Sequence, residues 1–183
     1  AGINKTNCKG EVEMDKKVHV LLNEQVQKEL YSAYLYFDMA NYYNIEGLDG
    51  FSNWFYVQAQ EEMDHAMLMR QYLLNNDQKV ALLPIDAPKS GYEDFGKPLA
   101  ESLEHEQFVT ASINAIYEAA MAAKDYRTTE FLNWFIKEQG EEEKNANDLI
   151  RKYELFGSDA KGLYGLDQEL AARVYTAPSL VLD

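Results

Sequence analysis

The stretch FYVQAQEEMDHAMLMRQY, residues 55–72, repeats apolar side chains at steps of three and four, a pattern typical of an amphipathic helix. The core-facing stripe of this helix carries polar residues near its middle, in the series Phe51, Phe55, Gln58, Glu62, His65, Met69, Tyr72. Glu62 and His65 are three residues apart and therefore share one helix face. A single E-x-x-H motif is a weak signal of a metal site, because it occurs often by chance.

Three other segments show the same feature, an apolar stripe interrupted by one glutamate near mid-helix. A lone glutamate in such a stripe would fit an end-of-bundle position, but four of them with a histidine do not. An unpaired ionised carboxylate is costly to bury, so such groups shift their pKa, pair or bind metal. Four carboxylates and one imidazole that converge in a bundle predict a two-metal site. The glutamates are Glu29 in residues 18–40, Glu62 in residues 51–72, Glu106 in residues 99–120 and Glu142 in residues 132–153.

Composition limits the classes of partner and compartment. The 183 residues suit one domain with a sizeable core. Acidic residues outnumber basic ones by 31 to 17, which disfavours nucleic acid and anionic membranes as partners. Cys8 is the single cysteine, so no intramolecular disulfide is possible, and no apolar run has the length of a membrane span. We expect a cytoplasmic protein, although a targeting segment that had been cleaved would leave no trace.

The order of helices predicts an all-α domain over residues 14–183, after a polar lead at residues 1–13. A four-helix bundle is expected over residues 14–156. Gly47 and Gly50 mark a tight turn after the first helix, so the second helix should return antiparallel. Residues 77–96 then form one long irregular stretch that is long enough to cross the whole bundle. This crossover, between the second and third helices, should start the third helix parallel to the second.

A short fifth helix is expected at about residues 160–175. Its apolar stripe reads Leu163, Leu166, Leu170, Val174. Such a helix can lie on the end of its own bundle or pack against other subunits. The sequence favours contact with other subunits, because a completed bundle leaves the apolar stripe without an obvious partner.

The chain at this point resembles the ferritin family, specifically the bacterial-type non-haem ferritins. The matching stretches fall in the expected order: LNEQVQKELYSAYLY at 22–36, QEEMDHA at 60–66, EHEQ at 104–107, FLNWFIKEQGEEEK at 131–144 and GLYGLDQEL at 162–170. The resemblance implies a ferroxidase that takes Fe(II) and O₂ or H₂O₂ as substrates. It also implies a hollow homo-oligomeric shell of 24 subunits that stores the ferric mineral.

The resemblance also implies a role for each matching residue. The first iron would be held by Glu29 and His65, and Glu62 would bridge both irons. The second iron would be held by Glu106 and Glu142, with Gln139 close enough to contact it. Tyr36 would lie beside the centre and could supply a further electron. A third iron site is implied at Glu61, Glu138 and Glu141, together with Glu142.

Departures from related families bear on the alternatives that stay open. Bacterioferritins carry a second E-x-x-H on the fourth helix, whereas this chain has Gln139 to Glu142 there, without histidine. Met63 matches a methionine that binds haem in bacterioferritins, but it lies outside the core stripe, so no haem is expected. A haem-binding bacterioferritin-like protein therefore stays an alternative. The others are a di-iron oxidase or oxygenase with a fixed metal cofactor, and a non-catalytic bundle.

Overall fold

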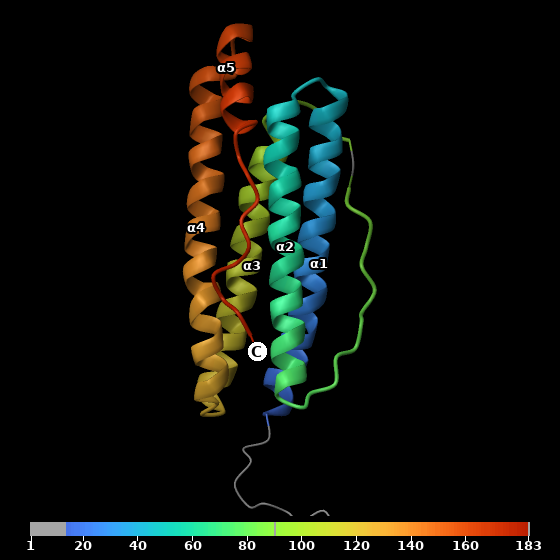
Figure 1. The fold of residues 1–183 in the computed structure, drawn as a ribbon, viewed down its shortest axis with the longest axis vertical. Coiled ribbons are helices and arrows are strands. Elements are labelled where there is room, and N and C mark those ends of the chain that lie inside the picture. Colours follow the sequence, from blue (N-terminus) through green and yellow to red (C-terminus); the bar gives the residue numbers. More distant parts are fainter. Residues whose placement is uncertain (1–13, 90, 183) are drawn as a thin grey trace, which may run out of the picture.

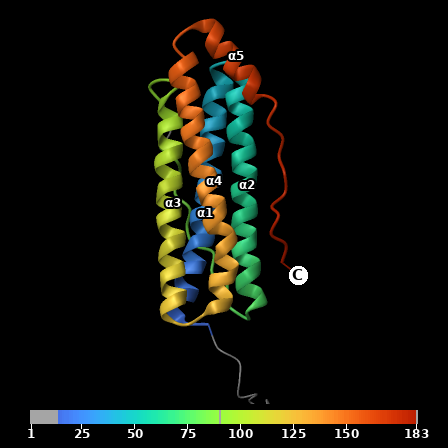
Figure 2. The ribbon, with the colours of Figure 1, turned by 90° about the vertical axis from the view of Figure 1, so that its left-hand side faces the viewer.

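The computed structural model describes residues 14–89 and 91–182, so the polar lead and Cys8 lie outside the described residues. The fold is all-α, as the sequence predicts (Figure 1). Its helices are α1 (Lys16–Ile45), α2 (Asp49–Asn75), α3 (Lys97–Ala122), α4 (Tyr126–Phe156) and α5 (Ala160–Leu170). The first four are long and form the bundle, and α5 lies at one end of it (Figure 2).

The topology is the predicted one with a single long crossover. Gly47, at a φ of 79°, turns the chain between α1 and α2, a backbone conformation that glycine adopts without steric cost. The crossover follows the outside of the bundle from the end of α2 to its opposite end (Figure 1). As a result α3 runs parallel to α2, and α4 returns parallel to α1.

The crossover is attached to α1 mainly by polar contacts. The Asn23 side chain donates to the Ala81 carbonyl at 3.0 Å and accepts from the Ala81 amide at 2.8 Å. His19 Nε2 lies 2.8 Å from the Lys79 carbonyl. Val80 packs on the core, but Leu82 is 80% exposed. Only some of the apolar side chains of the crossover are therefore buried within one chain.

The interior consists of two apolar clusters with a polar layer between them. One cluster lies toward the start of α1 and includes Leu22, Met69 and Phe135. The other lies toward the end of α1 and includes Phe51 and Leu149. The buried glutamates of the four helices come between the two clusters along each helix. The apolar clusters therefore fix the helices on both sides of the polar layer.

Helix α5 differs from the prediction in length and in the surface that it covers. It ends at Leu170, and Val174, which was expected in its stripe, is 79% exposed. Leu166 and Leu170 are buried against the bundle cluster that contains Phe51. Within this chain, α5 therefore closes the end of its own bundle, which is the arrangement that the sequence disfavoured.

A buried aspartate joins α5 to the start of α2. The Asp167 carboxylate accepts hydrogen bonds from the amides of Gly50 and Phe51, at 2.8 and 3.0 Å. These amides are in the first turn of α2, where backbone donors have no partner within the helix. Gly50 is required for this contact, because a Cβ there would lie 1.7 Å from the Asp167 carbonyl oxygen.

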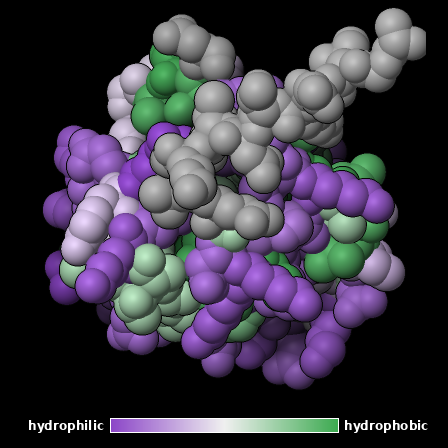
Figure 3. Space-filling view, turned by 90° about the horizontal axis from the view of Figure 1, so that it is seen from below, coloured by the Kyte–Doolittle hydropathy of each residue, from purple (hydrophilic) through white to green (hydrophobic). Residues whose placement is uncertain are grey.

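The described helices leave a largely polar exterior. Seen from the end where α1 and α4 begin, hydrophilic side chains dominate the surface, with apolar patches between them (Figure 3). None of the helices in the described ranges combines the length and the hydrophobicity that a membrane crossing needs.

We predict that Asp167→Ala destabilises the protein by about 1 kcal/mol, as the loss of a helix N-terminal cap generally does. Asp167→Asn should cost less, because the amide oxygen can still accept from both backbone groups. The free energy of unfolding from denaturant titration measures both effects. Gln168→Ala, at the exposed neighbouring position, is the control, and an equal loss there would contradict the capping role.

Candidate metal centre

Side chains from all four bundle helices meet in the polar layer. Each of them is at least 95% buried, so the predicted helix phases are confirmed. The α1 and α3 helices contribute one glutamate each, α2 contributes a glutamate and a histidine, and α4 contributes a glutamate. The residues are Glu29, Glu62, His65, Glu106 and Glu142.

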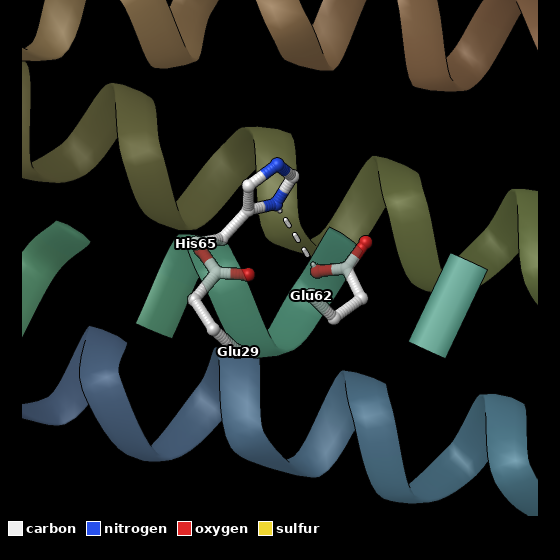
Figure 4. Close-up of side chains that lie close together, drawn as sticks. All are labelled: Glu29, Glu62 and His65. Atoms are coloured by element: carbon white, nitrogen blue, oxygen red, sulfur yellow. Dashed lines mark ion pairs between the residues drawn. The ribbon is translucent and has the colours of Figure 1, made fainter. Parts of the chain in front are cut away.

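Glu29, Glu62 and His65 form the tightest group (Figure 4). One ligand atom from each lies within 4.8 Å of the other two. His65 Nδ1 is 3.4 Å from Glu62 Oε2. Gln25, one turn before Glu29, donates to Glu29 Oε1 at 2.8 Å. This amide fixes one oxygen of Glu29 and leaves the other free to turn toward Glu62.

The opposite side of the layer is held by hydrogen bonds to Glu106 and Glu142. Glu106 accepts from the Tyr36 hydroxyl and from Gln139 Nε2, the latter at 3.1 Å. Glu142 Oε2 accepts from Gln58 Nε2 at 2.6 Å. Neutral donors therefore orient both carboxylates, and no protein cation neutralises them within these contacts.

Several buried polar atoms in the layer make no hydrogen bond to the described residues. They are Glu29 Oε2, Glu62 Oε1, His65 Nδ1 and Gln25 Oε1. Buried polar atoms without a partner are rare, because their desolvation is not compensated. Two carboxylate oxygens and an imidazole nitrogen are ligands that a divalent transition metal accepts. The residues present thus fit a metal ion in this group.

Burial raises the pKa values of the clustered carboxyl groups. For Glu29 and Glu62 the pKa lies well above its usual value, because burial and then the neighbouring carboxylates disfavour ionisation. Burial, reinforced by Glu106, raises the pKa of Glu142 to about 8. The Tyr36 pKa is also raised by burial, so the phenol keeps its proton. Without metal, the layer holds protons that a metal ion would replace.

Of the four residues expected at a third iron site, Glu138 and Glu142 share a close group, whereas Glu61 and Glu141 have cationic partners. Glu138 belongs to a second close group with His65 and Glu142. Glu61 instead accepts from the Arg173 guanidinium at 2.6 Å. The side chain of Glu141 is 59% exposed and lies 3.6 Å from the Lys137 ammonium. The third iron site stays a prediction, and two of its carboxylates, Glu61 and Glu141, lie beside a cationic side chain in this structure.

Sequence reasoning assigned no role to Gln58 or Arg173, which both contact the layer. Gln58 was visible as a polar residue one turn before Glu62 in the α2 stripe. Arg173 follows the last helix, where no periodicity indicates which surface a side chain will meet. Trp134 packs edge-on against His65, with ring centroids 5.6 Å apart.

Comparison with known proteins agrees with the fold. The family described as "Ferritin-like domain" matches residues 20–156, which is most of the chain. The chain belongs to the ferritin family. It is 38% identical to the bacterial non-heme ferritin of Campylobacter jejuni over 155 residues, which cover 85% of this chain and 93% of that protein. The Escherichia coli O6:H1 protein of the same name is 36% identical, over 82% of this chain and 91% of its own.

Solved ferritin structures share the architecture. An open-pore ferritin of the hyperthermophilic archaeon Archaeoglobus fulgidus superposes with a TM-score of 0.87 at 41% identity. The match covers 88% of this chain and 99% of that one. A form of the Archaeoglobus fulgidus ferritin closed by mutagenesis gives a TM-score of 0.87 at 42% identity, over 89% and 99% of the two chains.

We predict that the metal-free protein becomes less stable as the pH rises from about 5 to about 8. Because the Glu142 pKa is raised from 4.5 to about 8, the folded state binds more protons than the unfolded state between these values. Thermal unfolding of the apo protein across this pH range measures the slope.

Glu142→Gln removes one of the titrating groups and should make that slope shallower. Glu118→Gln, which removes an exposed carboxylate of α3, is the control for the change in net charge. An unchanged slope in Glu142→Gln would contradict the role of the buried carboxyl group.

Proposed function

We propose that the protein is an iron-storage ferritin that binds two Fe(II) ions in the polar layer and oxidises them to Fe(III). The supporting observation is the set of buried carboxylates around His65, with oxygen and nitrogen atoms that lack hydrogen-bond partners. Iron that binds as Fe(II), is oxidised and then leaves is best served by carboxylate oxygens and few nitrogens. The names of the relatives, bacterial non-heme ferritins, support the same conclusion.

Each residue has a position that suits its proposed role. Glu29 and His65 are assigned to the first iron, and Glu62 is grouped with them while it also interacts electrostatically with Glu106 and Glu142. Glu106 and Glu142 are assigned to the second iron. Gln139 and Tyr36 both donate to Glu106, so each can orient that carboxylate as iron arrives.

The substrate and the product require a larger assembly. We propose a shell of 24 subunits in the cytoplasm, with O₂ or H₂O₂ as the oxidant and the ferric mineral inside. Exposed apolar side chains on α1, α2 and the crossover support burial between subunits, among them Tyr34, Tyr56 and Leu82. In a single chain these side chains are exposed to water. Assembly of the shell would bury them between subunits.

A di-iron oxidase acting on an organic substrate is supported less well. Such an enzyme needs a substrate cavity beside the metals. The cavity next to Glu106 and Glu142 has a volume of about 10 Å³, with Tyr36 and Phe55 in its wall. That volume holds about one water molecule. A larger pocket, of about 190 Å³, lies on the other side of His65, and Glu61, Asp64 and Glu138 line it. Its acidic wall suits the passage of cations better than an organic substrate.

The assignment is tested by loading the apo protein anaerobically with Fe(II), admitting air and following the absorbance of ferric iron. A fast phase that saturates at about two irons per chain, followed by slower mineral growth in a very large particle, is expected for a two-metal ferroxidase. A small particle that retains two irons tightly would instead support a fixed-cofactor enzyme.

We predict that Glu62→Ala lowers the rate of the fast phase by more than about 10-fold, because the bridging ligand is lost while the shell still assembles. His65→Ala should weaken the first iron by a similar factor. Stopped-flow absorbance and size-exclusion chromatography measure rate and assembly. Glu118→Gln, at an exposed position of α3, is the control. A Glu62→Ala variant that keeps the full rate would refute the proposed site.

A further inference from the structure

The chain after α5 folds back along α2 and α4 past the polar layer (Figures 1 and 2). We name residues 171–182 the C-terminal strap. Asn53 donates to the Arg173 carbonyl at 2.9 Å, and Tyr175 donates to Asp64 at 2.6 Å. Trp134 Nε1 donates to Ser179 at 2.9 Å. Because these contacts come from both helices, the strap has a defined position over the acidic pocket beside His65.

Arg173 of the strap is hydrogen-bonded to two α2 side chains beside the proposed metal centre. Its side chain is 16% exposed, and its guanidinium lies 4.2 Å from the centroid of the Trp54 ring. Nη2 donates to Glu61 Oε2 at 2.6 Å, and Nη1 donates to Gln58 Oε1 at 2.8 Å. A guanidinium keeps its charge throughout the physiological pH range. It therefore supplies a permanent cation to the carboxylate of Glu61.

The same guanidinium orients one carboxylate of the layer through Gln58. An amide presents a carbonyl oxygen on one side and an NH₂ group on the other. Since Gln58 Oε1 accepts from Arg173, its Nε2 faces Glu142 Oε2, at 2.6 Å. Arg173 thus acts on Glu142 through one intervening side chain, in addition to its direct contact with Glu61.

The contact with Glu61 has a consequence for metal binding. Glu61 and Glu138 both line the pocket beside His65, and a divalent ion bound there would use the Glu61 carboxylate. The guanidinium already takes one of its oxygens, and its positive charge repels a second cation at this distance. An ion at Glu61 would therefore have to share this carboxylate with the guanidinium or displace it.

We propose that Arg173 is a positioning residue that limits each chain to two divalent ions by filling the Glu61 position with a protein cation. The limit rests on the proposed function, because it presumes that the polar layer binds two ions. A third ion binds at Glu61 and Glu138 only when the strap moves away. The position of the strap therefore controls whether iron can bind beside the centre as it enters or leaves.

The test is an anaerobic titration of the assembled apo protein with Co(II), followed by its visible absorption. Co(II) accepts the same oxygen and nitrogen ligands as Fe(II) and is not oxidised by the centre during the titration. The wild-type protein should bind two ions per chain with high affinity. Arg173→Gln should bind a third, with affinity raised at least about 10-fold over the wild type.

Two further variants separate charge from general perturbation. Arg173→Lys retains the cation beside Glu61 and should still bind only two ions. Arg151→Gln removes the same charge from an exposed position of α4, where the arginine is 3.8 Å from Asp148, and should also bind two. Thermal unfolding and particle size establish that each variant folds and assembles.

Different results would contradict the role of Arg173 and the two-metal function. If Arg173→Gln binds two ions like the wild type, or if the wild type already binds three, Arg173 does not set the limit. A third ion in Arg151→Gln as well would assign the effect to net charge and overturn the specific role. If the wild-type protein binds no Co(II) in the layer, the two-metal function itself fails.

Discussion

Burial of several carboxyl groups in one layer is the constraint on which the structure depends. In a low-dielectric interior, ionised carboxylates repel each other and lose their hydration, so protons or metal ions stabilise the layer. The raised pKa values of Glu29, Glu62 and Glu142 mean that burial favours the protonated carboxyl groups. The two apolar clusters on either side supply the compensating stability, because they pack the four helices independently of the charge state between them.

The two halves of the layer are prepared for metal in different ways. Glu29, Glu62 and His65 present atoms without hydrogen-bond partners, so an ion there displaces few existing contacts. Glu106 and Glu142 already accept from Tyr36, Gln139 and Gln58, and an ion must share or replace these bonds. The first position should therefore fill before the second. Such inequality suits a protein that passes iron onward rather than one that keeps a fixed pair.

Helical periodicity was sufficient to predict the bundle and the main carboxylates. Glu29, Glu62, Glu106 and Glu142 each lie in an apolar stripe, so their burial follows from the register of their own helix. The position of α5 did not follow, because its stripe is equally suited to its own bundle or to another subunit. The position of α5 on its own bundle is fixed by Asp167. Its hydrogen-bond partners at the start of α2 are more than 100 residues away in sequence.

Residues 61, 138 and 141 show the difference between matching a motif and assembling a site. The resemblance to bacterial-type ferritins transfers three acidic positions, and all three are present in the sequence. Their partners differ in origin: Arg173 of the distant strap contacts Glu61, and Lys137, one turn earlier on α4, lies beside Glu141. A carboxylate that already has a cationic neighbour binds a metal ion less readily than its position in a motif indicates. For this ferritin, the residues after the last helix therefore belong to any account of how many ions a subunit holds.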